Sequence, residues 1–381
     1  MDDKFVDMGF REFELVAPGL NRLIIPGEPR RLRHVKSPQV EFMPQASLRR
    51  LLQSGGDGGV IFHTLPDSLL TLVAAIPRDR KVLWIGWGYD YYPRLLGAAF
   101  PHGLLLPTTE KLVASRPQPP WARRILRQFR QRLGAFAAGT ASIKRRALAR
   151  IDYFSPVLPT EFDMAREHNP WFRPEHVDWN YGTLEDFAPP VGADHSAPGK
   201  DILVGNSATP ENNHLEVFDL LADTDTGDRR IIVPLSYGNH WYRDRIIEAG
   251  RLRFGDRFVP VTDYLPTATY AALLTGCGYA FMNHVRQQAL GNVCTLMLCG
   301  ARISMNRASP LYRWLQQRGA RIDVIDDPHG NAIPTRKLPP PLDTTAREIN
   351  RMLIEQHYLP ETRRLKTRAA LAAISGYCDL P

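Results

Sequence analysis

The chain has 381 residues, a formal net charge of +8 and a hydrophobic fraction of 44%. This length favours two domains, and the composition excludes disordered and fibrous classes. No apolar run is long enough for a membrane-spanning helix, and the acidic start differs from a signal peptide, so we expect the chain to remain in the cytosol. Four cysteines without a CxxC pair exclude a disulfide framework and a zinc knuckle.

Two apolar runs in the first half predict strands that end beside a titratable group. Residues 60–62 lead into His63, and the run that starts at Val82 leads into Asp90. The pattern predicts an α/β domain, and either His63 or Asp90 is a candidate general base for a sugar hydroxyl. His63 can instead be a hydrogen-bonded structural histidine, and Asp90 a turn or capping acid.

A basic segment follows in the same half. Residues 111–150 contain eleven Lys or Arg and no Asp or Glu, more than the whole surplus of eight. Arginines alternate with apolar residues at helical spacing, which is typical of a helix that binds an anionic membrane surface. The candidate membrane-binding residues are Trp121, Arg123, Arg124, Arg127, Phe129 and Arg130. A helix that packs its apolar stripe on its own core is the alternative, and the lack of a nucleic-acid-binding motif predicts no nucleic-acid partner.

From Asp201 onward, one unit repeats: a short β-branched run, a turn and an amphipathic helix. The predicted strands are residues 202–204, 231–233, 258–261, 279–282, 303–305 and 322–325. The predicted helices are residues 213–222, 241–249, 266–275, 287–299 and 310–318, with stops at Gly250, Gly300 and Gly319. This alternation predicts a doubly wound α/β sheet of parallel strands, which binds ligands beyond the carboxyl ends of its strands.

The turns at that edge are rich in small and amide-bearing residues, with two arginines and no acid. The candidate donor-binding residues are Gly205, Asn206, Ser207, Pro234, Tyr237, Gly238, Asn283, Arg286, Gln287, Gln288, Gly291, Asn292, Asn306 and Arg307. Arginines beside the N–H groups of helix starts form an anion site, and phosphate is the usual anion. The absence of GxGxxG and GxxxxGK[ST] argues against a nicotinamide dinucleotide and a P-loop. Asn212, Asn213 and Ser309 can simply cap helices.

Proline-rich stretches divide the chain. We predict a first domain over residues 1–190, a linker over 191–200, a second domain over 201–337 and C-terminal helices over 338–381 that pack back toward the first domain. The helices themselves are predicted over 345–357 and 360–373. Asp223, Thr224 and Asp225 match a metal-binding DxD but follow a helix, away from the carboxyl edge, so we predict a surface loop and no metal cofactor.

Four motifs of the second half carry a family resemblance: VGNS (204–207), VPxxY (233–237), RQQxxG (286–291) and NRxxP (306–310). In order and spacing they resemble the family 56 glycosyltransferases, bacterial enzymes named for the transfer of 4-acetamido-4,6-dideoxygalactose in enterobacterial common antigen synthesis. A WGxD stretch (87–90) extends the likeness to the first half. The resemblance implies a GT-B fold, with two Rossmann-like doubly wound domains facing across a cleft, the acceptor in the first and the donor in the second.

The resemblance also implies a Leloir hexosyltransferase of bacterial surface polysaccharide synthesis. Its donor would be a nucleotide-diphosphate sugar, a dTDP-sugar by the family, and its acceptor a polyprenyl-diphosphate-linked saccharide. The protein would bind peripherally to the cytoplasmic face of the inner membrane. Arg286, Gln287 and Gln288 would hold the diphosphate and sugar, Tyr237 the base or ribose, and Asp90 or else His63 would accept the proton. The alternatives are a sugar-nucleotide epimerase or hydrolase of the same fold, and a non-catalytic membrane-associated nucleotide-sugar-binding module.

Overall fold

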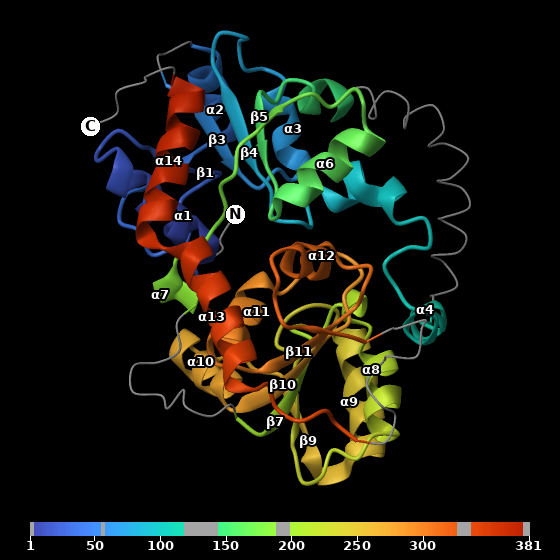
Figure 1. The fold of residues 1–381 in the computed structure, drawn as a ribbon. Helices are drawn as coiled ribbons and strands as arrows, with labels where there is room; N and C mark the ends of the chain where they lie inside the picture. Colours follow the sequence, from blue (N-terminus) through green and yellow to red (C-terminus); the bar gives the residue numbers. More distant parts are fainter. Residues whose placement is uncertain (1–3, 55–57, 118–143, 188–198, 326–336, 376–381) are drawn as a thin grey trace. The chain divides into compact units, whose positions relative to one another are not determined.

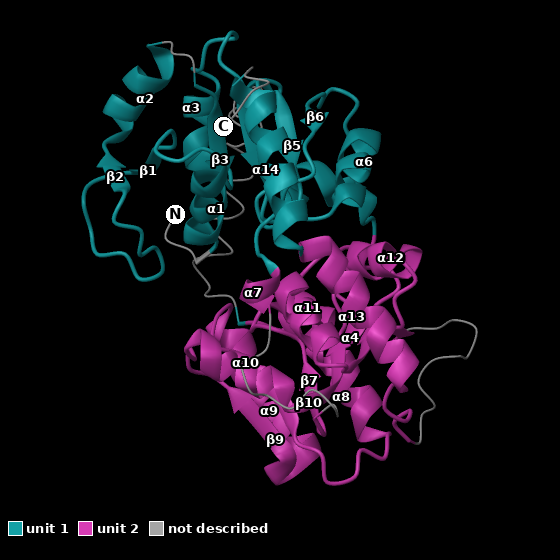
Figure 2. Cartoon of the chain, turned by 60° about the vertical axis from the view of Figure 1, so that its left-hand side comes forward, with its two compact units in different colours: residues 1–101, 117–183, 359–381 teal, residues 102–116, 184–358 magenta. Residues whose placement is uncertain are grey.

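The computed structural model describes residues 4–54, 58–117, 144–187, 199–325 and 337–375. The chain folds into two compact units (Figure 2). Unit 1 comprises residues 1–101, 117–183 and 359–381, and unit 2 comprises residues 102–116 and 184–358. Each unit is built around its own parallel sheet. The predicted α/β class is therefore confirmed for both halves of the chain.

Unit 2 holds a six-stranded sheet in the order β12-β11-β10-β7-β8-β9 (Figure 1). Its strands are β7 (Asp201–Val204), β8 (Ile231–Pro234), β9 (Phe258–Val261), β10 (Cys277–Met282), β11 (Arg302–Met305) and β12 (Asp323–Val324). All neighbouring strands are parallel, as the β-α alternation predicts. Because β7 and β10 are neighbours, the strand order reverses between them, and such a reversal opens a ligand crevice at the carboxyl ends.

The helices of unit 2 follow its strands. They are α4 (Pro107–Ala114), α7 (Leu184–Phe187), α8 (His214–Ala222), α9 (His240–Phe254), α10 (Thr267–Thr275), α11 (Leu290–Leu298), α12 (Pro310–Gln317) and α13 (Thr344–Tyr358). The central strands β7, β8 and β10 are buried along their whole length, in keeping with helices on both faces of the sheet.

Two helix boundaries of unit 2 differ from the prediction. Helix α9 does not stop at Gly250 but runs to Phe254, because Gly250 is buried where the helix crosses the ring of Phe258. Helix α11 begins at Leu290 instead of residue 287, because Ala289 has a left-handed φ of 62° and the preceding residues form a turn. The predicted glycine stops at Gly300 and Gly319 are confirmed by their positive φ angles.

Unit 1 contains a four-stranded parallel sheet, β3-β4-β5-β6, and a parallel pair, β1-β2. The strands are β1 (Leu23–Pro26), β2 (Val40–Met43), β3 (Val60–His63), β4 (Val82–Ile85), β5 (Tyr153–Ser155) and β6 (Glu175–His176). The helices are α1 (Lys4–Val16), α2 (Gln45–Gln53), α3 (Leu70–Val73), α6 (Pro159–His168) and α14 (Pro360–Ser375). Strand β4 is fully buried, and its Trp84 packs on Phe154 of β5 with ring centroids 4.7 Å apart.

The boundaries of the two units differ from those expected. Residues 102–116 lie within the predicted first domain but belong to unit 2. Glu216 of α8 explains this, because its carboxylate accepts hydrogen bonds from Thr109 N at 2.8 Å and Thr109 Oγ1 at 2.6 Å, in the first turn of α4. The two predicted C-terminal helices exist, but they divide between the units: α13 packs in unit 2, and α14 packs against α1 in unit 1.

Candidate functional site

The loops after β7 and β10 meet at the point where the strand order of unit 2 reverses. Asn206 connects them through its side-chain amide. Its Oδ1 accepts hydrogen bonds from Gln288 Nε2 at 3.0 Å and from His284 Nε2 at 3.1 Å. Its Nδ2 donates to the Tyr237 hydroxyl at 2.9 Å, in the loop after β8. The predicted convergence of these three turns is thereby observed, but Asn206 uses its side chain to hold the loops together.

His284 is the buried centre of this cluster, and the sequence-based list of site residues omits it. Its Nε2 lies 2.9 Å from Asn212 Oδ1 and 3.1 Å from Asn206 Oδ1, so this nitrogen carries the proton. Burial, with a smaller contribution from the nearby Arg286, holds the pKa of His284 well below its usual value. The imidazole is therefore neutral, and its buried Nδ1 has no partner among the described residues. In the sequence, its position two residues after the buried strand β10 looks ordinary by itself.

Asn212 fixes the shape of the loop after β7. Its Oδ1 accepts the Asn206 N–H at 2.8 Å, and its Nδ2 donates to Thr209 Oγ1 at 2.8 Å and to Ser207 Oγ at 3.1 Å. Gly205 makes this possible, because its φ is +65° and a Cβ there would lie 2.5 Å from Asn212 Oδ1. The alternative of simple helix capping is thus wrong for Asn212.

The RQQ segment ends beside the same loop. Gln288 Nε2 lies 3.1 Å from Thr209 Oγ1 in addition to its contact with Asn206, while its buried Oε1 has no partner among the described residues. Gln287 is buried, and Arg286 is half-buried with Nη1 donating to the Gln287 carbonyl at 3.0 Å. The segment therefore reaches the switch point as predicted, although it precedes α11 instead of starting it.

The loop after β8 lies against the loop after β7. Ala208 N donates to the Tyr237 carbonyl at 2.8 Å, and Asn239 N donates to the Ala208 carbonyl at 2.9 Å. Gly238 permits this approach, since its φ is +120° and a Cβ would meet the Ala208 backbone at 2.6 Å. Tyr237 stays 56% exposed, so its ring remains accessible at the carboxyl edge. Pro234 is buried as the last residue of β8.

The remaining donor-site candidates are dispersed. Asn283 and Asn306 pair at the ends of β10 and β11, with Asn306 Nδ2 donating to Asn283 Oδ1 at 3.0 Å. Arg307 is exposed. Gly291 and Asn292 lie within α11, where Asn292 Nδ2 donates to Tyr270 of α10 at 2.7 Å. Asn213 and Ser309 occupy N-cap positions without a side-chain cap bond; Asn213 instead accepts from Leu106 N at 2.9 Å.

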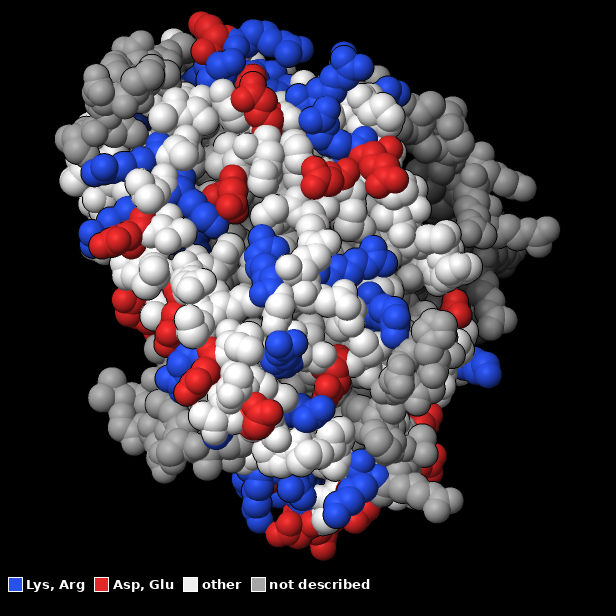
Figure 3. Space-filling view, in the orientation of Figure 1, with Lys and Arg blue, Asp and Glu red and all other residues white. Residues whose placement is uncertain are grey.

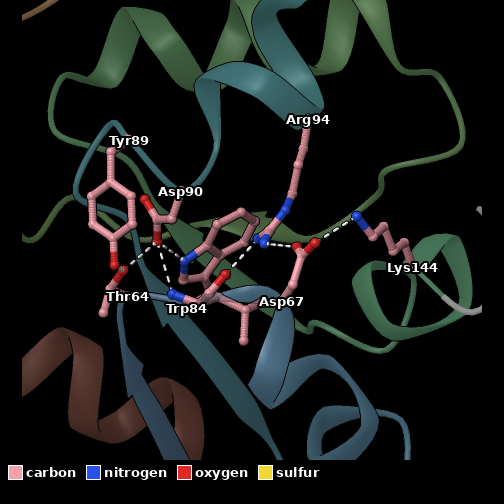
Figure 4. A network of polar contacts seen from close by, with 8 residues as sticks. Thr64, Asp67, Trp84, Tyr89, Asp90, Arg94 and Lys144 are labelled. Carbon is pink, nitrogen blue, oxygen red and sulfur yellow. Dashed lines mark hydrogen bonds and ion pairs between the residues drawn. The ribbon is translucent and has the colours of Figure 1, made fainter. Parts of the chain in front are cut away.

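Asp90 is the centre of a second polar cluster, in unit 1 (Figure 4). Asp90 is only 3% exposed. Oδ2 accepts from Leu65 N at 2.8 Å, Trp84 Nε1 at 2.9 Å and Thr64 Oγ1 at 3.0 Å, and Oδ1 accepts from Trp87 N at 2.9 Å. A carboxylate that already accepts these four hydrogen bonds is poorly placed to take a proton from a substrate hydroxyl, so the geometry weighs against Asp90 as the base.

His63 is half-buried among the rings of Phe13, Trp179 and Tyr181, and its Nδ1 lies 2.7 Å from the Tyr181 hydroxyl. Burial lowers the pKa of His63 to about 4. At neutral pH the imidazole is therefore unprotonated but a weak base, because efficient general bases have pKa values near the working pH. This environment matches the structural alternative for His63 more closely than the catalytic one.

Other predicted features can be placed only in part. The candidate membrane-binding residues, from Trp121 to Arg130, lie outside the described residues, as does most of the predicted linker. On the face drawn in Figure 3, basic and acidic side chains of the described residues are intermixed. Asp225 lies in a turn after α8, where its Oδ1 accepts the Gly227 N–H at 3.0 Å, as expected for a surface loop.

Two further features are absent from the residues that the structure describes. Within them, no group of His, Cys, Asp or Glu is arranged to hold a metal ion. Nor does any helix there have the length and apolar character needed to cross a bilayer.

The family comparison agrees with the resemblance seen in the motifs. Residues 186–331 match the model of the 4-alpha-L-fucosyltransferases, glycosyl transferase group 56. The matched region contains β7 to β12 and therefore the whole Asn206–His284–Gln288 cluster. Over this region the match agrees with the resemblance to family 56.

Solved structures show the same fold at low sequence identity. The chain is similar to Anabaena HepE in complex with UDP-glucose, with a TM-score of 0.51 and 11% identity over 88% of this chain and 86% of that one. It is also similar to the N-terminal domain of Candida albicans trehalose-6-phosphate phosphatase, with a TM-score of 0.55 and 10% identity over 88% of this chain and 74% of that one. The GT-B type of fold is thus confirmed, and with the family match the chain is a glycosyltransferase.

Proposed function

We propose that this glycosyltransferase moves a deoxyamino sugar from a nucleoside-diphosphate sugar, a dTDP-sugar, to a saccharide carried on a polyprenyl diphosphate. In this proposal unit 2 binds the donor and unit 1 contacts the acceptor. The reaction belongs to bacterial surface polysaccharide synthesis at the cytoplasmic face of the inner membrane. The observation that carries the proposal is the cluster of Asn206, His284 and Gln288 at the strand-order reversal of the region matched by family 56.

The chemistry of the cluster suits a nucleotide sugar. Doubly wound sheets bind nucleotides at the carboxyl ends of the strands where the order reverses. Arg286 supplies a positive charge next to this point, and the exposed ring of Tyr237 offers a surface for a base or ribose. HepE, which has a similar fold, binds UDP-glucose. Cleavage of the sugar–phosphate bond leaves negative charge on the departing diphosphate, and a fixed guanidinium stabilises that charge in the transition state.

The experiment that tests this function is a transfer assay with a radiolabelled dTDP-sugar and a polyprenyl-diphosphate-linked saccharide in detergent. We expect label to move to the lipid, and Arg286→Ala to lower kcat by about 10²- to 10³-fold. Arg251→Ala is the control, because Arg251 is exposed in the last turn of α9, at the end of the helix away from the carboxyl edge. Release of free sugar without lipid labelling would instead indicate a hydrolase, and dTDP binding without turnover a non-catalytic module.

We further propose that transfer needs no metal ion, with Arg286 taking the place of a cation at the diphosphate. The same assay in excess EDTA should retain full activity. Complete loss of activity in EDTA, restored by magnesium or manganese, would contradict this part of the proposal and leave the transfer itself standing.

A further inference from the structure

Thr64 has an unusual backbone conformation directly after strand β3. Its φ is +73°, in the left-handed region, where a β-branched residue is a genuine outlier. Holding such a residue there is energetically unfavourable, and conformations of this kind cluster at functional sites. The carboxyl end of a parallel strand is also where α/β sheets bind their ligands. The strained backbone of Thr64 therefore marks a candidate functional position.

The neighbours of Thr64 hold this conformation from two sides. Asp90 Oδ2 accepts both the Thr64 hydroxyl at 3.0 Å and the Leu65 N–H at 2.8 Å. The Leu65 carbonyl accepts a hydrogen bond from Arg94 Nη1 at 2.5 Å, and Arg94 in turn pairs with Asp67 (Figure 4). The short segment after β3 is thus clamped through its amide, its carbonyl and its side chain.

The side chain of Thr64 also contacts an exposed tyrosine. Thr64 Oγ1 lies 2.6 Å from the Tyr89 hydroxyl oxygen, and Tyr89 is 45% exposed. Thr64 Oγ1 faces both acceptors, so its single proton is shared between the Tyr89 oxygen and the Asp90 carboxylate. A buried carboxylate therefore holds the threonine hydroxyl that contacts the exposed tyrosine at the carboxyl edge of the unit 1 sheet.

We propose that Tyr89 forms a saccharide-binding subsite that orients the acceptor, and that the buried Thr64 and Asp90 are positioning residues acting through it. The inference rests on the proposed glycosyl transfer and names a residue of unit 1 that recognises its acceptor. An aromatic ring with a polar tip packs on the apolar face of a sugar while its hydroxyl bonds a sugar hydroxyl. Asp90 is thereby assigned a role other than general base.

The test compares Thr64→Val, Thr64→Ser and Tyr89→Phe in the transfer assay, with Thr71→Val as a control. Thr71 lies on the exposed side of α3, so its variant makes the same chemical change away from the subsite. We expect Thr64→Val and Tyr89→Phe to raise the acceptor KM about tenfold, the effect of one lost hydrogen bond. Thr64→Ser keeps the hydroxyl and should stay close to wild type in acceptor KM, and the donor KM should be unchanged in all three variants.

The outcomes separate this inference from the proposed function. If wild-type protein transfers no sugar to lipid, the proposed function fails. If wild type transfers but Thr64→Val and Tyr89→Phe keep the wild-type acceptor KM, the subsite is wrong and the function stands. Asp90→Asn adds a further check, because an amide cannot accept all four donors at once. It should mimic Thr64→Val in acceptor KM, whereas a drop in kcat alone, with a changed pH profile, would make Asp90 the base after all.

Discussion

Asn206 shows how one amide determines the geometry of three loops. It accepts two hydrogen bonds and donates one, so little of its capacity is left for a ligand. Asn206→Ala should leave His284 and Gln288 misplaced and weaken dTDP binding about tenfold. Asn169→Ala, whose amide donates to backbone carbonyls within unit 1, is the matched control. Isothermal titration calorimetry measures both, and equal affinities for the two variants would contradict this role.

His214 is a second buried imidazole, and it makes stability depend on pH. Burial lowers its pKa to about 3, while the unfolded chain has an ordinary histidine pKa near 6.5. Below pH 6.5 the imidazole of His214 is protonated in the unfolded state but stays neutral in the folded state. The stability from this group is therefore complete above pH 6.5 and decreases by about 1.4 kcal/mol per pH unit as the pH falls toward the folded pKa.

His214→Gln tests this dependence. Glutamine can retain a hydrogen bond to Tyr242, whose hydroxyl lies 3.1 Å from His214 Nδ1. We expect the variant to be less stable than wild type at pH 7, because its fit in the core is poorer. Between pH 7 and pH 5, however, its urea midpoint should fall less than that of wild type. Parallel curves for the two proteins would show that His214 is not the group responsible.

At the scale of elements, the strands of unit 2 follow from local sequence, and several helix ends do not. The β-branched runs at β7, β8 and β9 fall where the pattern places them. At Gly250, in contrast, the sequence predicts a helix stop. In the structure the helix continues there, and the ring of Phe258 packs against this glycine. The late start of α11 depends in the same way on the loop contacts of Gln288, which no local pattern predicts.

Gly250 and Gly291 give opposite predictions for the same substitution. Both lie in helices, where alanine is favoured over glycine by about 1 kcal/mol. At Gly250 an added Cβ would lie 2.1 Å from Phe258, so Gly250→Ala should destabilise unit 2 by about 1–3 kcal/mol. At Gly291 the nearest atom is 3.4 Å away, on Phe187, so Gly291→Ala should be neutral or stabilising. Denaturant unfolding of both variants measures the change in the free energy of unfolding. A loss of stability of similar size in both variants would refute the packing argument.

In the candidate site, too, some residues can be predicted from local sequence, and others depend on tertiary contacts. The composition of the turns predicts that Asn206, Tyr237 and Gln288 lie at one edge of the sheet, because parallel strands align their carboxyl ends. The structure shows these contacts. His284 and Thr64 were missed as site residues. A histidine after a strand and a threonine before Leu-Pro look ordinary in sequence. Their importance comes from burial and from a backbone angle, which are tertiary properties.

At the scale of the whole molecule, the boundary between the units is set by contacts more than by chain order. Helix α4 is flanked by unit 1 sequence, yet Asn213 and Glu216 bind its first turn to α8 of unit 2. The proline-rich stretches carried no information about this exchange. A segment can cross between units because side-chain hydrogen bonds at a helix start fix its partner.

This exchange gives a prediction for nucleotide binding. A ligand that binds only folded unit 2 stabilises it by mass action, by about 2.7 kcal/mol at a hundred times the dissociation constant. With excess dTDP, amide hydrogen exchange should therefore slow in β7, β10 and α11, and also in α4, despite its position in the first half of the chain. Unit 1 elements such as β3 and α14 should exchange at their ligand-free rates. Slowing in β3 without slowing in α4 would place the donor on unit 1 and overturn the assignment of the two units.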